Sequence, residues 1–189
     1  MKRHPALRDL SSDHHQGLVQ ARRLTRAAGE HGTGSTGGES EDASAQARPR
    51  EALRALAADF VAFWHRHTAP HFREEEEVLL PAFARFGDPA APHVVRTLVE
   101  HVHIRRLVGD LRRQLAAGPV SADTVRALGE SLREHIRFEE NVLFPMIEGA
   151  MPEQALLQMA EEARRFRAAH EAHKAHKAHE AHEAHKVGP

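Results

Sequence analysis

The chain has 189 residues, a formal net charge of −1 and no cysteine. The lack of cysteine excludes disulfides, zinc–thiolate sites, iron–sulfur clusters and thiol catalysis. The balanced charge gives no reason to expect a nucleic acid or an anionic membrane as a partner. No apolar run approaches the roughly 18 residues of a membrane span, and no apolar stretch follows the N-terminal residues, so we expect a soluble, cytoplasmic protein.

The first helix is predicted to end near Ala28 and to begin at Ser11 or Ser12, both of which are plausible N-caps. Its apolar residues recur at helical spacing and form a stripe along one face. His14 lies in phase with this stripe, whereas His15 lies at its edge. The phase therefore favours His14 as the inward-facing histidine.

Residues 29–50 are rich in glycine and serine, a composition typical of a flexible linker, and we expect a disordered insertion there. A long second helix is predicted from about Arg50 to Gly87. Pro70 interrupts this helix. Because proline removes a backbone hydrogen bond, it predicts either a kink or a break between two helices.

Two further helices complete the predicted core. The third runs from about Pro92 to Ala117 and is closed by Gly118. The fourth starts after Ser121, a candidate N-cap, and ends near Gly149. Each of these helices carries a histidine within its apolar stripe.

No stretch of the sequence shows the alternation of apolar and polar residues that is typical of a strand. Four amphipathic helices with short connections predict an all-α fold, an antiparallel up-down four-helix bundle over residues 1–150. An additional C-terminal helix is expected over residues 151–168, followed by a low-complexity His-rich tail over residues 169–189. Histidine recurs every third residue in this tail, so on a helix of about 3.6 residues per turn the imidazoles circle the axis. The tail is a candidate site for additional nickel, zinc or copper, or else a solubilising extension.

An internal repeat carries the most specific signal in the chain. Residues 71–81 and 135–145 align along their whole length, and each copy places a glutamate four residues after a histidine, which puts both side chains on one helix face. Together with the histidines of the first and third helices, four imidazoles and two carboxylates fall within apolar stripes. They are His14, His71, Glu75, His101, His135 and Glu139.

Burying two carboxylates without a cation costs several kcal/mol each, so either they are exposed or a positive charge lies between them. The next residues, Glu76 and Glu140, can then face solvent. Imidazoles and carboxylates without thiolates suit iron, manganese or zinc. Two octahedral ions have about twelve positions, of which the six side chains and a bridging oxo or hydroxo group fill about ten, leaving about two for a small ligand.

The two His-x-x-x-Glu segments, each closed by a proline, together with Asp13-His14 and Glu100-His101, resemble the hemerythrin-like family of His-His-Glu cation-binding domains. The resemblance covers about residues 5–150, apart from the insertion. It implies a four-helix bundle around a non-haem di-iron centre, two iron ions with an oxo or hydroxo bridge, that handles dioxygen, nitric oxide, peroxide or iron itself. The metal ligands it implies are His14, His71, Glu75, His101, His135 and Glu139.

The chain departs from the oxygen-carrying hemerythrins in its third helix, where those proteins have two histidines four residues apart. Thr97 and Arg105 stand on either side of His101, so only one ligand matches. This departure weakens an oxygen-carrier interpretation and favours a reactive or exchangeable metal site. His67, one turn before His71, is a less favoured ligand and otherwise a neighbour that orients the site.

Three functions are compatible with these residues. The first is a di-iron protein that binds or reacts with a small diatomic or peroxide ligand and has no nucleic-acid or membrane partner. The alternative is storage, buffering or sensing of iron or another transition metal without redox turnover. The third is a structural bundle in which imidazoles and carboxylates neutralise each other. The sequence assigns no catalytic residue and leaves open whether the protein is an enzyme, which metal it binds and whether it forms an oligomer.

Overall fold

The computed structural model describes residues 3–32 and 43–186, and within these ranges every regular element is a helix. The prediction of an all-α fold is therefore confirmed for the described chain. Residues 33–42, the centre of the expected insertion, lie outside the described residues. None of the described helices is long and apolar enough to cross a membrane.

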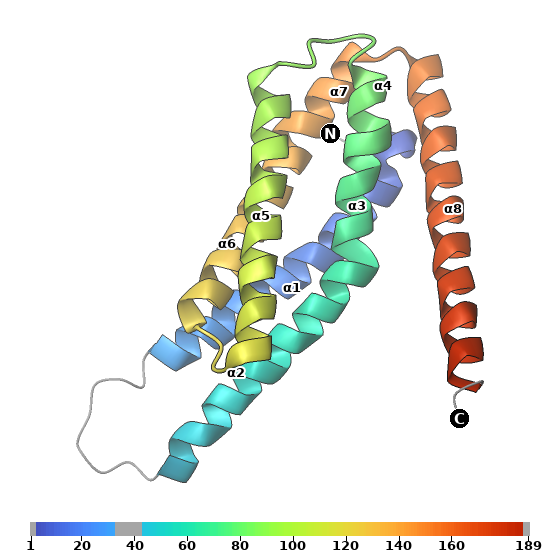
Figure 1. Cartoon of the computed structure of the whole chain (residues 1–189). Coiled ribbons are helices and arrows are strands. Elements are labelled where there is room, and N and C mark those ends of the chain that lie inside the picture. Colours follow the sequence, from blue (N-terminus) through green and yellow to red (C-terminus); the bar gives the residue numbers. More distant parts are fainter. Residues whose placement is uncertain (1–2, 33–42, 187–189) are drawn as a thin grey trace.

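The elements join into long helical columns. They are η1 (Pro5–Leu7), α1 (Arg8–Gly32), α2 (Ala43–Phe63), η2 (Trp64–Thr68), α3 (Ala69–Glu74), η3 (Glu75–Leu79), α4 (Leu80–Phe83), α5 (Pro92–Ala117), α6 (Ala122–Phe138), η4 (Glu139–Leu143), α7 (Phe144–Ala150) and α8 (Glu153–Lys186). The π-helical turns η2, η3 and η4 continue their neighbours, so residues 43–83 form one column and residues 122–150 another. Consecutive columns run in opposite directions, and α8 lies along the outside (Figure 1).

The columns enclose two apolar clusters with a polar layer between them. α1 and α5 each contact both α2 and α6, which closes a ring of four columns. In the fourth column, Leu132 belongs to one apolar cluster and Leu143 to the other, and the buried His135 and Glu139 lie between them in the sequence. α8 adds Met159 to the second cluster and so packs against the outside of the ring.

The first helix differs from the prediction at both ends. It begins with the 3-10 turn η1, in which the His4 side chain accepts a hydrogen bond from the backbone N–H of Ala6 at 3.2 Å. Ser11 and Ser12 lie inside α1, so the prediction that one of them is the N-cap is wrong. The helix also continues through Gly29, since a glycine inside a helix costs only about 1 kcal/mol relative to alanine.

The second helix starts and ends earlier than predicted. α2 begins at Ala43 rather than near Arg50, and its column ends about one turn before Gly87. Residues 29–32 and 43–50 are therefore helical, so the helices reach further into the expected insertion than its composition indicated.

The third and fourth helices agree closely with the prediction. α5 begins at Pro92 and ends at Ala117, and the Ser121 side chain caps α6 by accepting a hydrogen bond from the Thr124 N–H at 3.4 Å. α8 continues past residue 168, where the C-terminal helix was expected to end. The Ala, Glu and Lys between the histidines favour helix and explain this continuation.

Each π-helical turn precedes a proline. η2, η3 and η4 end two residues before Pro70, Pro81 and Pro145, respectively. In an α-helix the proline ring clashes with the carbonyl four residues earlier, and a wider turn, bonded to the fifth residue back, accommodates this misfit. Pro70 therefore does not break the helix, and η3 and η4 begin at the two candidate carboxylates, Glu75 and Glu139.

Candidate metal centre

The six side chains singled out in the sequence lie together in one buried cluster, here called the buried centre. α1, α3, α5 and α6 each contribute one histidine, and the two glutamates are the first residues of η3 and η4. None of the six exposes more than 5% of its surface. The buried centre comprises His14, His71, Glu75, His101, His135 and Glu139.

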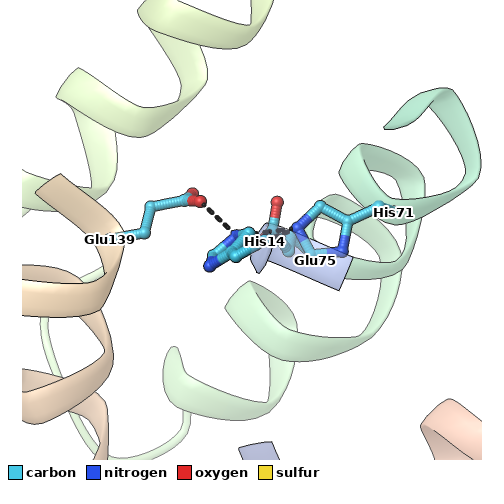
Figure 2. A group of neighbouring side chains, drawn as sticks. All are labelled: His14, His71, Glu75 and Glu139. Carbon is cyan, nitrogen blue, oxygen red and sulfur yellow. Dashed lines mark hydrogen bonds and ion pairs between the residues drawn. The ribbon is translucent and has the colours of Figure 1, made fainter. Parts of the chain in front are cut away.

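The buried centre divides into two overlapping groups of ligand atoms, and within each group these atoms lie within 4.8 Å of one another. One group contains the histidines of α1 and α3, the other those of α5 and α6, and both contain Glu75 and Glu139. Figure 2 draws the first group, in which Glu139 approaches His14 from the side opposite His71. The shared carboxylates make the two groups one site.

Glu75 faces an imidazole of each group with a different oxygen. Its Oε1 lies 3.2 Å from His71 Nε2, and its Oε2 lies 3.3 Å from His101 Nε2. A carboxylate with its two oxygens turned to two histidine groups is placed to bridge two ions.

Glu139 also spans both groups. Its Oε2 lies 3.1 Å from His14 Nε2 and 3.2 Å from His135 Nε2, and its Oε1 lies 3.8 Å from His101 Nε2. Both glutamates therefore contact histidines of both groups.

The two histidine pairs have nearly the same geometry. The ring centroids of His14 and His71 are 4.7 Å apart at an interplanar angle of 69°, and those of His101 and His135 are 4.8 Å apart at 71°. The Nε2 atoms of His14 and His71 are 2.9 Å apart. Two nitrogens bound to one ion at about 2.1 Å and at a right angle are about 3 Å apart, so this pair is spaced to share an ion.

Carboxylates hold three of the four imidazoles at their outer nitrogen. The Nδ1–H groups of His14, His101 and His135 donate to Glu140 at 2.7 Å, Glu76 at 2.7 Å and Glu100 at 3.0 Å, respectively. Arg3, Arg105 and Arg96 donate to these carboxylates in turn. Such pairs fix the ring orientation and direct the other nitrogen, Nε2, into the centre.

His71 is the least restrained of the four imidazoles. Its Nδ1 lies 3.5 Å from Asp13 Oδ2 and makes no hydrogen bond within the described parts of the chain. Asp13 is also drawn outward, because Arg167 of α8 lies 3.7 Å from the same oxygen. His71 therefore has more freedom to turn than the other three.

Sequence reasoning missed the outer carboxylates. It assigned the glutamates that follow the two candidate ligands to the solvent side, whereas the structure places them, partly buried, against imidazoles. The acidic residues that precede histidines are visible in the sequence, but their contacts cross between helices: Asp13 faces His71, and Glu100 holds His135. A carboxylate next to a candidate ligand is the signal that could have found them.

Arg105 lies one turn after His101 in α5. Its guanidinium donates to both oxygens of Glu76, at 2.8 and 2.9 Å. It therefore supplies no ligand and instead fixes the carboxylate that holds His101.

The oxygens at the middle of the buried centre lack hydrogen-bond donors. Both oxygens of Glu75 and both oxygens of Glu139 are buried, and none accepts a hydrogen bond from the part of the chain that the structure describes. A buried polar atom without a partner costs about 1–3 kcal/mol, and more if it is charged. A metal cation among these oxygens would remove that cost, and nitrogen and oxygen donors suit iron, manganese or zinc.

The pKa shifts in the buried centre also favour positive charge beside its carboxylates. Burial opposes charge on Glu75, but His71 and His101 outweigh burial and hold the pKa of Glu75 well below its ordinary value. Burial also opposes charge on His101, yet Glu75 and Glu76 raise its pKa to about 9. The carboxylates thus favour positive charge on His101, and a metal ion would supply that charge in place of its proton.

The family model of the hemerythrin HHE cation-binding domain matches residues 7–147. The chain belongs to the hemerythrin HHE cation-binding domain family. The match contains all six residues of the buried centre, and α8 follows it. The buried His and Glu groups fit the metal cation that this family binds. No curated protein and no solved structure matches the chain.

A small cavity borders the hemerythrin centre on the side of His14 and His71. This inner cavity has a volume of about 20 Å³, and Gly17, Phe72 and Ile136 contribute to its walls. Such a volume holds about one water molecule or a ligand of similar size. Gly17 keeps the space open, since a Cβ added there would lie 2.7 Å from Ile136 Cδ1.

Several other histidines of the hemerythrin domain lie outside the buried centre. His15, His65, His67, His93 and His103 are exposed, and none of them belongs to either group of ligand atoms found in the described chain. The helical phase that favoured His14 over His15 therefore agrees with their positions. His67 faces the cavities beside the centre rather than the centre itself.

Proposed function

We propose that the chain is a non-haem di-iron protein that binds or reacts with a small oxidant: dioxygen, nitric oxide or peroxide. The observation that carries this proposal is the pair of buried carboxylates, Glu75 and Glu139, whose oxygens accept no hydrogen bond within the described residues and face both histidine pairs. Such a donor set suits two ions that share two carboxylates.

Each histidine pair holds one ion in this proposal. His14 and His71 bind one iron, His101 and His135 bind the other, and both glutamates are shared. An iron pair supplies the one-electron steps that small oxidants require, whereas the protein supplies binding, orientation and electrostatics.

Aromatic rings shield the imidazoles from water. Phe144 stacks on His14 at a centroid distance of 5.2 Å, and Phe72 stacks on His101 at 3.7 Å. The apolar surroundings of a metal site control its access to solvent and its local dielectric. These rings therefore favour chemistry with a small neutral ligand over exchange with bulk water.

The outer carboxylates stay ionised at neutral pH. Burial opposes charge on Glu76 and Glu140, but hydrogen bonds from His101 and His14, and from arginines, outweigh it and lower both pKa values to about 2. Each carboxylate can then accept the Nδ1–H of its imidazole and leave Nε2 free for metal. With Nδ1–H held in this way, the lone pair of Nε2 is the nitrogen donor that an iron ion requires.

The inner cavity supports the size of the proposed ligand. It borders His14 and His71, its volume is about 20 Å³, and its walls are largely apolar. A diatomic molecule or peroxide is close to this size, whereas larger substrates are not. The cavity thus favours a small oxidant at the ion held by this pair.

We extend the proposal to the architecture, an antiparallel up-down four-helix bundle with α8 as an added helix. The closed ring of contacts among α1, α2, α5 and α6 and the opposite directions of consecutive columns support it (Figure 1). A cytoplasmic location remains a prediction.

Iron content and near-ultraviolet absorption test the di-iron proposal. The full chain is loaded anaerobically with Fe(II), oxidised and freed of excess metal, beside a Glu75→Gln/Glu139→Gln variant that keeps the side-chain shape. We expect the parent chain to hold about two more irons than the variant and alone to show the bands of a bridged iron pair. Equal iron and equal spectra would overturn the proposal. Metal held by the His-rich tail cancels, because the tail is the same in both chains.

A second candidate function is storage, buffering or sensing of iron or another transition metal without redox turnover. The single histidine that α5 contributes favours it, because Arg105, one turn after His101, pairs with Glu76 and supplies no further ligand. Adding dioxygen, nitric oxide and peroxide in turn to the iron-loaded chain separates the two functions. A spectral response to any of them supports oxidant chemistry, and no response to all three supports metal handling.

A further inference from the structure

A larger cavity lies between α8 and the hemerythrin domain, on the outer side of His71. This outer cavity has a volume of about 240 Å³. Its polar lining includes Asp13, His67, His71, Glu74, Arg167 and His170. Asp13, His67 and His71 also line the inner cavity, so the two cavities meet around His71.

The outer cavity is large enough for a hydrated ion. A water molecule needs roughly 10–15 Å³ of cavity volume, so the inner cavity holds about one water and the outer cavity many more. The exposed side chains of Arg66, His67 and Glu171 place the outer cavity at the protein surface. A cation arriving from solvent can therefore approach His71 while it keeps much of its hydration shell.

Two imidazoles from different helical columns line this cavity. His67 comes from η2 and His170 from α8, which runs alongside α3 in Figure 1. The ring of His67 lies against Phe63 at a centroid distance of 4.9 Å, which orients it. With the carboxylate of Asp13, the cavity offers imidazole nitrogen and carboxylate oxygen, the donor types that also make up the buried centre.

A positive charge already occupies the acidic side of the outer cavity. The Arg167 guanidinium donates to both oxygens of Glu74, at 2.5 and 2.9 Å, and lies 3.7 Å from Asp13. Glu74 is only 3% exposed, so its carboxylate depends on this partner. Arg167 thus neutralises Glu74, so the donors left for a metal ion in this cavity are the imidazoles and the Asp13 carboxylate.

His71 connects the outer cavity to the buried centre. It lines both cavities, belongs to the group that includes His14, and makes no hydrogen bond through Nδ1 within the described residues. The other three imidazoles are fixed by carboxylates. His71 is therefore the ligand best able to turn between the cavity and the centre.

We propose that the outer cavity is an uptake site for divalent metal ions, in which His67 and His170 bind a hydrated ion before it passes to His71 and His14. The proposal rests on the proposed function, because it requires that the buried centre binds metal. It adds two residues outside the buried centre and gives α8 a role beyond packing.

The period-three histidine series begins at this cavity. His170 is the first member and lines the cavity, and His173 and His176 follow along α8 as exposed residues. Neutral imidazoles bind divalent first-row metals. Among the members of the series whose side chains the structure describes, His170 is the one that lines the outer cavity.

Cobalt uptake tests the proposal under anaerobic conditions, without any oxidant chemistry. Metal-free full chain is mixed with limiting Co(II), and the visible absorption of Co(II) at the buried centre is followed by stopped flow. A His67→Ala/His170→Ala variant should fill the centre more slowly, on the order of tenfold, as expected when a local store of the incoming ion is lost. Its final absorption should equal that of the parent chain.

A His65→Ala/His173→Ala variant is the matched control. It removes one exposed histidine from η2 and one from α8, neither of which lines the outer cavity, and it should fill as fast as the parent chain. Equal rates in the parent and the His67/His170 variant overturn the uptake site. A lower final absorption in that variant also overturns it, because His67 or His170 would then be a permanent ligand.

The same experiment separates failure of this proposal from failure of the proposed function. If the parent chain and the Glu75→Gln/Glu139→Gln variant give the same cobalt spectrum, the buried centre binds no metal and both proposals fall. If their spectra differ but the uptake rates of the histidine variants do not, only the uptake site falls.

Discussion

The two histidine pairs of the buried centre share their carboxylates but differ in how firmly they are held. In the closed pair, His101 and His135, both outer nitrogens donate to carboxylates, and Phe72 stacks on His101. In the open pair, His14 and His71, only His14 makes such a bond, and both cavities border His71. We therefore expect small ligands and ions to reach the buried centre at the open pair.

This difference does not come from the internal repeat, which gives each pair one histidine. It comes from the helices around the repeat. α5 supplies Glu100 to His135 at hydrogen-bond distance, whereas α1 supplies Asp13 to His71 at a longer distance. α8 then draws Asp13 outward through Arg167. A repeated ligand motif thus acquires two unlike sides when unrepeated helices pack against it.

Metal removal should have the largest effect, because it empties both pairs at once. Ions that bind only the folded chain stabilise it by about 4 kcal/mol when free metal exceeds the Kd about 1,000-fold. At about 2–4 °C per kcal/mol for a chain of this size, chelation should lower the Tm by roughly 8–16 °C. Calorimetry on the loaded and chelated chain measures the change. An unchanged Tm would favour the structural alternative, in which imidazoles and carboxylates only neutralise each other.

The pH dependence of stability should distinguish the metal-free from the metal-loaded chain. The pKa of His101 is raised from 6.5 to about 9. Its contribution to stability is therefore complete below pH 6.5 and is lost as the pH rises through about 9, on the order of 3 kcal/mol in all. A bound metal ion would replace this proton, so the loaded chain should keep its stability over the same range. Urea unfolding of both forms at the two pH values measures the difference.

At acidic pH the dependence of stability on pH has the opposite sign: stability is lost as the pH falls. The pKa values of Glu76 and Glu140 are lowered from 4.5 to about 2, so their contribution is present above pH 4.5 and is lost as the pH falls through about 2. The metal-free chain should thus be most stable between pH 4.5 and 6.5. A metal-free chain that gains stability between pH 6.5 and 9 would contradict this assignment of charges.

The donors of the buried centre were predictable because their relation is local. A histidine and a glutamate four residues apart share a helix face whatever packs around them, and the repeat of this spacing marked His71, Glu75, His135 and Glu139. The bounds of α5 and the Ser121 cap were predictable for the same reason. Each depends on neighbours within a few residues.

What the sequence could not provide is the pairing between helices. Asp13 precedes His14 in the chain but faces His71 in space. No spacing along the sequence indicates that choice, because it depends on how α1 rotates against α3. The docking of α8 through Arg167 and Glu74 is equally long-range. These contacts are the ones that make the two histidine pairs unlike.

Removing one outer carboxylate from each histidine pair tests whether the closed pair is held more firmly than the open pair. Glu76→Gln weakens a 2.7 Å bond to His101 of the closed pair, and loss of such a partner costs about 10–100-fold in metal affinity. Asp13→Asn, on the open side, should cost about threefold or less, because Asp13 lies 3.5 Å from His71. Competition with a coloured chelator measures both affinities. Equal losses would show that His71 is held as firmly as His101.

The smallest change tests the open side with one methyl group. Gly17→Ala places a Cβ 2.7 Å from Ile136 Cδ1, at the wall of an inner cavity of about 20 Å³. We expect a stability change of about 1 kcal/mol or less, unchanged metal content, and nitric oxide binding to the iron-loaded chain weakened roughly tenfold, as one added carbon does in a tight pocket.

Gly109→Ala is the control for this variant, because its Cβ would make an ordinary contact with Arg113 at 3.6 Å and Gly109 does not line the inner cavity. It should bind nitric oxide as the parent chain does. If Gly17→Ala does so too, small ligands do not reach the ion of the open pair through the inner cavity. The outer cavity, which also borders His71, would then be the remaining route on that side. The open pair would still be the accessible one, but through the face that α8 covers.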